Sequence, residues 1–382
     1  MSSILRLPAC IHYGKKTLER VSESITRHGV KQVLVFTDEP LRKLGKTEAL
    51  ENYISKTGAK FEIVDRIKPE PSIGDVEEAL AVVKNSKPDL LIGIGGGSVL
   101  DIAKLASVLL GASYGVRDLL KDPLQAQKKC RTLMIPTTCG TGSEATANAI
   151  VAIPEEQVKK GIVNPVLIPD EVILDAELLA GIPKSIIAST GVDALAHCVE
   201  CYTSKKATPL SDLYAAAGAK FIFHNIEKAY TQNDAEALEK MLLGAYYGGA
   251  AISGSGTTAV HALSYPLGGR YHIPHGVSNA VLLAPVMRFN RDACLSRLAA
   301  LCDSVYPEYA KETEDVKADL LIRRIVEIVK KTEIPLSLKD FGLKNEDLEE
   351  LVLAGSQQTR LLVNNMRELS LDNIRAIYQQ VI

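Results

Sequence analysis

The stretch Leu90-Leu-Ile-Gly-Ile-Gly-Gly-Gly-Ser98 runs from an apolar segment into three consecutive glycines. Its apolar part, Leu90–Ile94, has the length of a buried strand, and helical spacing follows over Ser98–Leu110. The glycines allow a sharp turn in which the backbone approaches a ligand closely. We expect Ser98 to cap the helix and Asp101 to fall in its first turn, where free N–H groups and the helix dipole attract an anion. The stretch therefore predicts a strand, a phosphate-binding turn and a helix.

A tight turn without a ligand is the competing interpretation of the same glycines. The stretch does not match the G-x-G-x-x-G pattern that is typical of Rossmann dinucleotide sites. The two interpretations differ in whether the turn binds a phosphate. For a Gly-Gly-Gly-Ser turn within a doubly wound sheet we favour the phosphate-binding interpretation.

Short apolar strands alternate with helical segments through the first half of the chain. Strands are expected at Gln32–Phe36, Phe61–Val64 and Thr132–Pro136, and helices from about Pro40 and over Ile73–Asn85. This alternation predicts a parallel sheet with helices on both faces.

Strand-like segments disappear after about Ile182. Long helical patterns follow, such as Leu213–His224, Ala235–Ala251 and the tail Val316–Ile382. We therefore expect an α/β dinucleotide-binding domain over residues 1–182 and an all-helical, metal-binding domain over residues 183–382.

Composition narrows the function classes. The 382 residues carry a formal net charge of −2, no Trp and 5% aromatic residues, which argues against nucleic-acid or anionic-membrane partners. The N-terminus lacks a signal-peptide pattern, and no apolar segment is long enough to span a bilayer. Seven mostly isolated cysteines favour free thiols in a reducing compartment, so we expect a cytoplasmic protein.

Two further segments suggest a dinucleotide. Residues 136–144, Pro-Thr-Thr-Cys-Gly-Thr-Gly-Ser-Glu, follow another predicted strand and offer the hydroxyls of Thr137, Thr138 and Thr141 to a ribose or a nicotinamide, although the segment alone could be a polar loop. Asp38 ends the first predicted strand, where a carboxylate can bind an adenosine ribose and repel a 2′-phosphate, which would select NAD over NADP. A helix-capping or turn Asp explains the same position equally well.

Four side chains of metal-ligand type occur in the second half. Asp193 and His197 lie four residues apart in a helical pattern and so share one face, and His261 and His275 follow near small residues. One carboxylate and three imidazoles suit Fe²⁺ or Zn²⁺. Cys198 and Cys201 form a C-x2-C without a second thiolate pair, so we interpret them as helix-packing thiols, although Cys201 shares a face with His197.

Together these segments resemble the iron-containing alcohol dehydrogenase family. The resemblance covers essentially the whole chain and is carried, in this order, by GGGSVLDIAK (95–104), PTTCGTGSEAT (136–146), GVDALAHCVE (191–200) and VHALSYPLGGRYHIPHG (260–276). It implies a dehydroquinate synthase-like fold, in which an α/β domain binds NAD and a helical domain supplies a metal site in the cleft between the two. Members of the family are usually homodimers or larger homo-oligomers.

The resemblance also implies residue roles. Asp193, His197, His261 and His275 would bind Fe²⁺ or Zn²⁺, and Asp38 would meet the adenosine ribose. The remaining candidates for contact with the dinucleotide are Gly95, Gly96, Gly97, Ser98, Asp101, Thr137, Thr138, Thr141, Ser143, Lys160 and Leu178.

One position departs from the family pattern. Several members carry a second histidine four residues after the ligand that matches His261, where it relays protons, and this chain has Tyr265 there. Tyrosine is a poor proton acceptor at neutral pH, because its ordinary pKa is about 10. His272 is a candidate for the proton relay in place of that histidine. The simpler interpretation is that Tyr265 packs against the pocket and that His272 lies at the surface.

The expected reaction is hydride transfer between NAD(H) and a small alcohol or aldehyde, such as a primary alcohol or a propanediol. Three alternatives remain open: a hydroxyacid–oxoacid transhydrogenase, a lyase of dehydroquinate synthase type, and a dinucleotide sensor without turnover. The metal-side segments contain only Arg270 as a candidate for a phosphorylated substrate, which disfavours the lyase.

Overall fold

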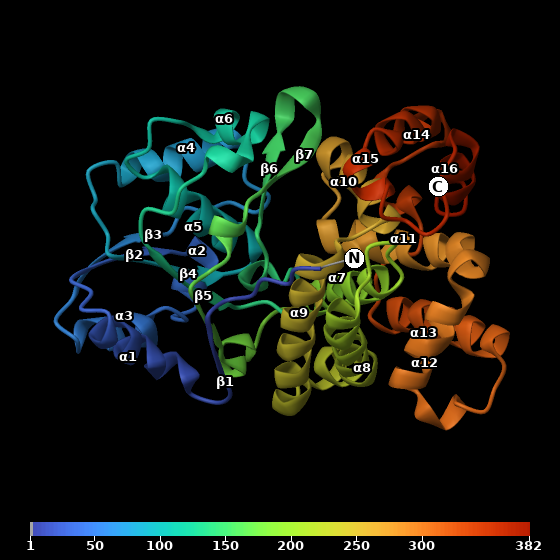
Figure 1. Ribbon diagram of the computed structural model, residues 1–382, viewed down its shortest axis with the longest axis horizontal. Coiled ribbons are helices and arrows are strands. Elements are labelled where there is room, and N and C mark those ends of the chain that lie inside the picture. Colours follow the sequence, from blue (N-terminus) through green and yellow to red (C-terminus); the bar gives the residue numbers. More distant parts are fainter. Residues whose placement is uncertain (1–2) are drawn as a thin grey trace. The chain divides into compact units, whose positions relative to one another are not determined.

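The computed structural model describes residues 3–382, which form two compact units (Figure 1). The α/β unit comprises Arg6–Thr138 and Ser143–Ala180, and the helical unit comprises residues 3–5, Cys139–Gly142 and Gly181–Ile382. The boundary expected after residue 182 lies close to the change of unit between Ala180 and Gly181. The short segment Cys139–Gly142, which belongs to the helical unit, was not anticipated.

A six-stranded parallel sheet, in the order β1-β8-β5-β4-β2-β3, organises the α/β unit. Every residue of β4 is buried, as expected for a central strand covered on both faces. Strands β6 and β7 form a separate antiparallel pair. The strands are β1 (Cys10–Tyr13), β2 (Gln32–Phe36), β3 (Lys60–Val64), β4 (Leu90–Gly95), β5 (Arg131–Pro136), β6 (Asn148–Ile153), β7 (Val158–Val163) and β8 (Glu171–Leu174).

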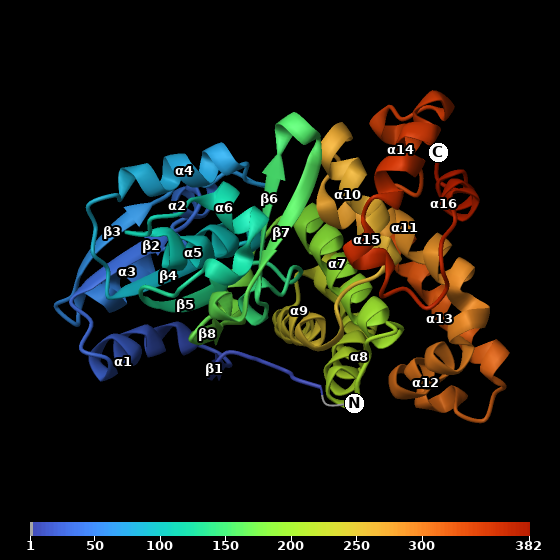
Figure 2. The same cartoon turned by 45° about the horizontal axis from the view of Figure 1, so that its top comes forward.

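Helices cover both faces of this sheet (Figure 2). Leu34 and Phe36 alternate along β2 and join one apolar cluster with side chains of α4, α5 and α6, whereas α1 and α3 pack against each other elsewhere in the unit. The helices are α1 (Arg20–Arg27), α2 (Glu39–Lys43), α3 (Glu48–Ser55), α4 (Ile73–Val82), α5 (Gly97–Leu109) and α6 (Val116–Lys121).

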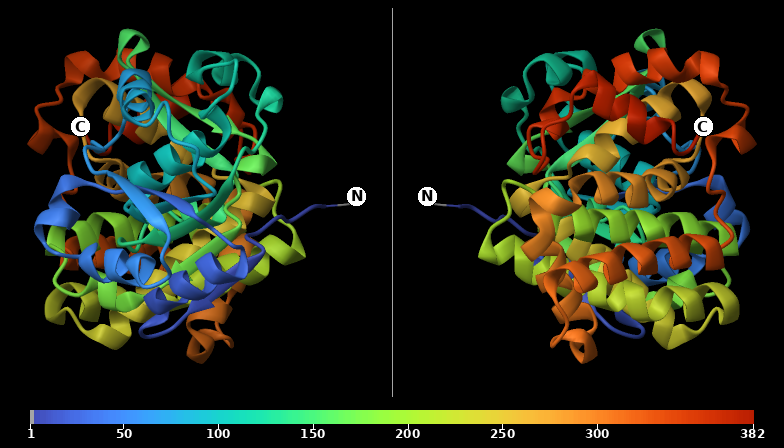
Figure 3. Two further views of the ribbon diagram at one scale, coloured as in Figure 1. Left: turned by 90° about the vertical axis from the view of Figure 1, so that its left-hand side faces the viewer. Right: turned by 90° about the vertical axis from the view of Figure 1, so that its right-hand side faces the viewer.

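The second unit is helical throughout its described secondary structure. Its longest helices, α7, α8 and α9, pack side by side (Figure 3). The helices are α7 (Lys184–Tyr202), α8 (Pro209–Gln232), α9 (Ala235–Ser255), α10 (Ala259–Tyr271), α11 (His275–Asn290), α12 (Leu295–Val305), α13 (Glu314–Lys331), α14 (Leu348–Ser356), α15 (Thr359–Leu362) and α16 (Leu371–Tyr378).

The predicted α/β unit followed by a helical unit is confirmed. The four predicted strands appear within one residue of their expected bounds, but β1, β6, β7 and β8 were missed. The predicted helix Leu213–His224 is only the middle of the longer α8. Two local predictions about the glycine turn are wrong. Gly97 already has helical conformation, so Gly96 caps α5, Ser98 lies inside the helix and Asp101 lies beyond its first turn.

Among residues 3–382, none of the helices combines the length and the apolar character needed to cross a membrane. All seven cysteines are free thiols.

A close backbone approach in the helical unit gives a test of packing. A Cβ atom on Gly249 of α9 would lie 2.3 Å from the carbonyl oxygen of Gly142, whose φ is +60°. We expect Gly249→Ala to lower the free energy of unfolding by about 1–3 kcal/mol, because the added methyl group must displace backbone. Gly74→Ala in α4 is the control, since its new Cβ meets nothing closer than 3.7 Å. Equal stability of the two variants in urea denaturation would contradict this packing argument.

Candidate metal centre and dinucleotide loops

The carboxyl ends of three neighbouring strands bring the predicted dinucleotide residues to one edge of the sheet. Asp38 follows β2, the glycines follow β4, and Thr137 and Thr138 follow β5, with β4 hydrogen-bonded to both neighbours. The chain passes from β2 outward to β3 but from β4 in the opposite direction to β5. Ligands of open α/β sheets bind at such a switch point, outside the carboxyl ends of the strands.

Asp38 caps helix α2 in this position. Its carboxylate accepts a hydrogen bond from the Leu41 N–H at 2.9 Å. Partial burial raises the pKa of Asp38 above its ordinary value, and the Leu41 bond opposes this rise. The capping role that competed with the ribose role is therefore present, and the ribose role stays a prediction.

The glycine turn presents backbone rather than side chains. Gly96 adopts an extended conformation before α5, and the Thr137 N–H donates to the Gly95 carbonyl at 3.0 Å. A Cβ atom on Gly95 would come within 2.7 Å of the Val99 side chain, so this position cannot accept a larger residue without movement. The Ser98 hydroxyl accepts a hydrogen bond from the Glu70 N–H at 3.0 Å, so this hydroxyl already has a partner within the protein.

Other dinucleotide candidates are more dispersed. Asp101 is buried and bonds the Ser143 hydroxyl at 2.5 Å and the Ile150 N–H at 2.9 Å, so both of its oxygens already have protein partners. Lys160 on β7 pairs with Glu156 at 2.6 Å and is half exposed. Leu178 is buried in the α/β unit, whereas Thr141 belongs to the helical unit. The roles of these residues stay predictions.

Three helices of the helical unit bring the four predicted metal ligands together. Asp193 and His197 lie one turn apart on α7, His261 lies in the first turn of α10, and His275 begins α11. The Asp193 Oδ1 atom lies 3.7 Å from Nε2 of His197, 3.6 Å from Nε2 of His261 and 3.8 Å from Nε2 of His275. Neighbouring donors around a tetrahedral ion with bonds of about 2.1 Å lie about 3.4 Å apart, so this spacing fits a divalent cation.

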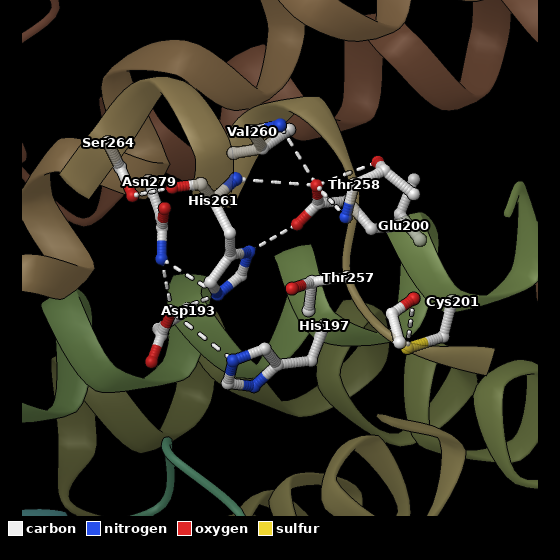
Figure 4. Close-up of polar contacts among 12 residues, drawn as sticks. Asp193, His197, Glu200, Cys201, Thr257, Thr258, Val260, His261, Ser264 and Asn279 are labelled. Atoms are coloured by element: carbon white, nitrogen blue, oxygen red, sulfur yellow. Dashed lines mark hydrogen bonds and ion pairs between the residues drawn. The ribbon is translucent and has the colours of Figure 1, made fainter. Parts of the chain in front are cut away.

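The rings are arranged around the carboxylate rather than scattered. His197 and His261 stack with ring centroids 4.7 Å apart (Figure 4). His275 meets His261 edge-on, with ring centroids 5.3 Å apart. Asp193, His261 and His275 form the most compact group, with all their ligand atoms within 4.8 Å of one another. His197 lies outside this group, but its Nε2 atom is 3.7 Å from Asp193 Oδ1.

Asn279 occupies the middle of this arrangement. Its amide nitrogen lies 2.6 Å from Asp193 Oδ1 and 3.1 Å from His261 Nε2 (Figure 4). The same nitrogen lies 3.2 Å from His275 Nε2. The amide thus stands in for a positive group among three electron-pair donors, while its own oxygen is buried without a hydrogen-bond partner. The converging donors and the buried amide oxygen without a hydrogen bond both fit a site for a cation.

Glu200 fixes His261 from behind. One carboxylate oxygen accepts from the N–H groups of Thr258 and Val260, both at 2.9 Å, and from the Thr258 hydroxyl at 2.8 Å. The other oxygen accepts from Nδ1 of His261. Because Glu200 holds the Nδ1 proton, the neutral ring presents the Nε2 lone pair toward Asp193, which is the tautomer that binds a metal.

The electrostatics of the cluster favour a positive charge at its centre. Burial alone would lower the pKa of His261, but the carboxylates of Glu200 and Asp193 raise it to about 9. Burial would raise the pKa of Asp193, yet the surrounding imidazoles hold it below its ordinary value. Two buried carboxylates therefore require either a proton on a ring or a metal ion in its place.

The two proton-relay candidates differ in placement. Tyr265 is buried, with its ring centroid 5.9 Å from that of His275. His272 is exposed and ends α10 in a left-handed conformation with φ of +53°. The predicted packing thiols, Cys198 and Cys201, are fully buried.

Glu200 and Asn279 were missed in the sequence, although a signal for each was present. Glu200 follows Asp193 by seven residues and His197 by three, which places it on their face of α7. Asn279 follows His275 by four residues on α11. Extending each ligand's helical face by one turn would have found both.

We expect Glu200→Gln to weaken metal binding roughly 10–100-fold, because an amide cannot hold the His261 ring as a carboxylate does. Glu236→Gln, at an exposed position in the first turn of α9, is the matched control. Competition with a chelator of known affinity measures the effect. Wild-type metal affinity in a folded Glu200→Gln protein would leave Glu200 only its role as a cap of α10.

Comparison with known proteins covers the whole chain. Residues 8–176 match the family model described as "Iron-containing alcohol dehydrogenase", and residues 187–382 match "Fe-containing alcohol dehydrogenase family, C-terminal". Long-chain-alcohol dehydrogenase 1 of Geobacillus thermodenitrificans (strain NG80-2) is 36% identical over 376 residues, which span 97% of this chain and 95% of the relative.

Two solved structures are similar over their full length. The crystal structure of 1,3-propanediol oxidoreductase gives a TM-score of 0.94 at 29% identity and covers 100% of both chains. The crystal structure of sulfoacetaldehyde reductase from Bifidobacterium kashiwanohense, a complex with NAD+, gives a TM-score of 0.90 at 25% identity and covers 100% of this chain and 99% of the other.

Proposed function

Because the chain belongs to the iron-containing alcohol dehydrogenase family, a family of metal-dependent oxidoreductases, we propose that it moves a hydride between NAD(H) and a small alcohol or its aldehyde. One observation carries the metal part of this proposal. The Asp193 carboxylate meets three imidazole Nε2 atoms at 3.6–3.8 Å. Four convergent donors of this kind serve a metal site, not a packed core.

Asp193, His197, His261 and His275 would hold Fe²⁺ or Zn²⁺. Such an ion supplies a Lewis acid that lowers the pKa of a bound alcohol and polarises a carbonyl in the reverse direction. The chain's own part is to orient the donors. Glu200 sets the tautomer of His261, and Asp193 supplies the negative charge that balances the ion.

The carboxyl edge of the sheet would bind NAD. The backbone of Gly95–Gly97 and the start of α5 suit a pyrophosphate, because they offer N–H groups without side chains. The cofactor supplies the hydride chemistry, and the chain positions it. The NAD+ complex of the similar sulfoacetaldehyde reductase supports the same nucleotide here.

A similar structure and the residues beside the proposed metal site support one class of substrate. The similarity to 1,3-propanediol oxidoreductase supports a primary alcohol or a diol such as propane-1,3-diol or propane-1,2-diol. Tyr265 would shape the pocket beside His275, with its ring centroid 5.9 Å from that of His275. The exposure of His272 favours solvent, rather than a buried relay, as the destination of the alcohol proton.

We expect His261→Ala to remove bound metal and to reduce the rate of alcohol oxidation. The reduction should exceed the roughly 10–100-fold loss that is typical when a residue that only hydrogen-bonds to a metal ligand is replaced. His224→Ala is the control, since His224 bonds the Val305 carbonyl outside the cluster. Metal content by mass spectrometry and NADH absorbance with a panel of alcohols measure the two effects. Full activity in metal-free protein would refute the proposal, and hydride exchange between paired hydroxy and oxo acids without free NADH would indicate the transhydrogenase instead.

We expect Asp38→Asn to lower the preference for NAD over NADP, measured as the ratio of kcat/KM values, by about tenfold or more. Asparagine keeps the oxygen that caps α2 but loses the charge that repels a 2′-phosphate. Asp122→Asn is the matched control, because Asp122 also accepts a capping bond, from the Leu124 N–H at 3.0 Å. An unchanged ratio in Asp38→Asn would assign Asp38 to capping alone.

A further inference from the structure

We propose a second cation site in the α/β unit, formed by Cys10, His12 and Glu171, that takes a thiophilic divalent ion such as Zn²⁺. All three residues belong to the α/β unit, whereas Asp193 and its histidines belong to the helical one. The inference therefore does not depend on the proposed dehydrogenase activity.

Strand register places the three side chains on one face. Cys10 and His12 are two residues apart on β1, so both point to the same side of the sheet. Cys10 pairs directly with Glu171 on the neighbouring parallel strand β8. The backbone register itself thus places Glu171 beside Cys10.

The distances between the donor atoms fit a tetrahedral ion. Cys10 Sγ lies 3.4 Å from His12 Nε2, and His12 Nε2 lies 3.5 Å from Glu171 Oε2. All three donor atoms lie within 4.8 Å of one another. Around Zn²⁺ bound at about 2.0–2.3 Å, neighbouring donors are about 3.4–3.6 Å apart. The two measured separations fall at this spacing.

Glu171 has a buried carboxylate oxygen that makes no hydrogen bond. The residue is only 3% exposed, and its Oε2 atom is buried without a hydrogen-bond partner. A buried carboxylate oxygen without a hydrogen bond is costly, and His12 Nε2 at 3.5 Å pairs its charge only when the ring is protonated, so a cation facing it would restore the balance. The same atom is the one that faces His12.

The other oxygen of Glu171 is held by the protein. Oε1 accepts from the Ser24 hydroxyl and meets His28 Nε2, both at 2.9 Å, while the Arg131 guanidinium lies 3.8 Å away. These contacts orient the carboxylate in the way that outer-shell partners orient metal ligands. Arg131 is nearly half exposed and lies against Oε1, so its charge does not occupy the position of the ion.

The donor types select the ion. A thiolate with an imidazole and a carboxylate prefers Zn²⁺ or Co²⁺ over Mg²⁺ or Ca²⁺, which require oxygen donors. Binding would release the proton of the Cys10 thiol, since only the thiolate coordinates. Three protein donors leave a fourth position for water.

Cobalt titration of the purified full chain, under anaerobic and reducing conditions, tests the site. The Asp193 cluster contains no thiolate, so a thiolate-to-cobalt charge-transfer band in the near ultraviolet reports the second site alone. We expect the band in the wild-type protein and in His261→Ala, and its complete loss in Cys10→Ser. Cys130→Ser, which changes the other half-buried cysteine, should retain it. Glu171→Gln should weaken cobalt binding at this site roughly tenfold or more, without removing the thiolate.

Two results would overturn the proposal. One is the absence of a thiolate band from wild-type protein saturated with Co²⁺, a result that does not depend on how any variant folds. The other is an equal band in Cys10→Ser. Loss of alcohol oxidation in His261→Ala while the band persists would separate the two sites, because only the Asp193 cluster would have been emptied.

Discussion

The buried carboxylate of Glu200 joins helix α7 to the start of helix α10. Its two oxygens serve different purposes, because one satisfies backbone N–H groups at the start of α10 and the other receives the proton of His261. Thr258 precedes α10 but makes no side-chain cap, so the negative charge that the helix start favours comes from another helix. The position of the helix and the orientation of the ligand are therefore set by a single group.

Residues at the carboxyl edge of the sheet also have two structural roles each. Asp38 caps α2 while it stands at the carboxyl end of β2, and the glycines that end β4 also begin α5. In a parallel sheet these ends fall together because every strand runs in the same direction. The residues that we propose to contact a nucleotide are consequently residues that terminate strands and begin helices.

Sequence reasoning found the elements whose patterns are long and periodic, and it failed where local chemistry is ambiguous. The continuous apolar strand Leu90–Gly95 and the helical face of Asp193 and His197 were recognisable, because burial and helical spacing act over several residues. Strands β1 and β8 were missed, since each is only four residues long and the sheet stabilises them through their neighbours. Ser98 was expected to cap α5, because serine is the better cap in isolation, yet Gly97 enters the helix first. Spacing along one chain could not show that Asn279 meets three ligand atoms from two other helices and its own.

Glu200 also decides how His261 meets a cation. With the Nδ1 proton held by a buried carboxylate, the imidazole cannot move that proton to its other nitrogen without leaving one charged oxygen of Glu200 without its donor. In the proposed metal site the ring would therefore need little reorganisation to coordinate an ion. Preorganisation of this kind is built into hydrogen positions as much as into the path of the backbone.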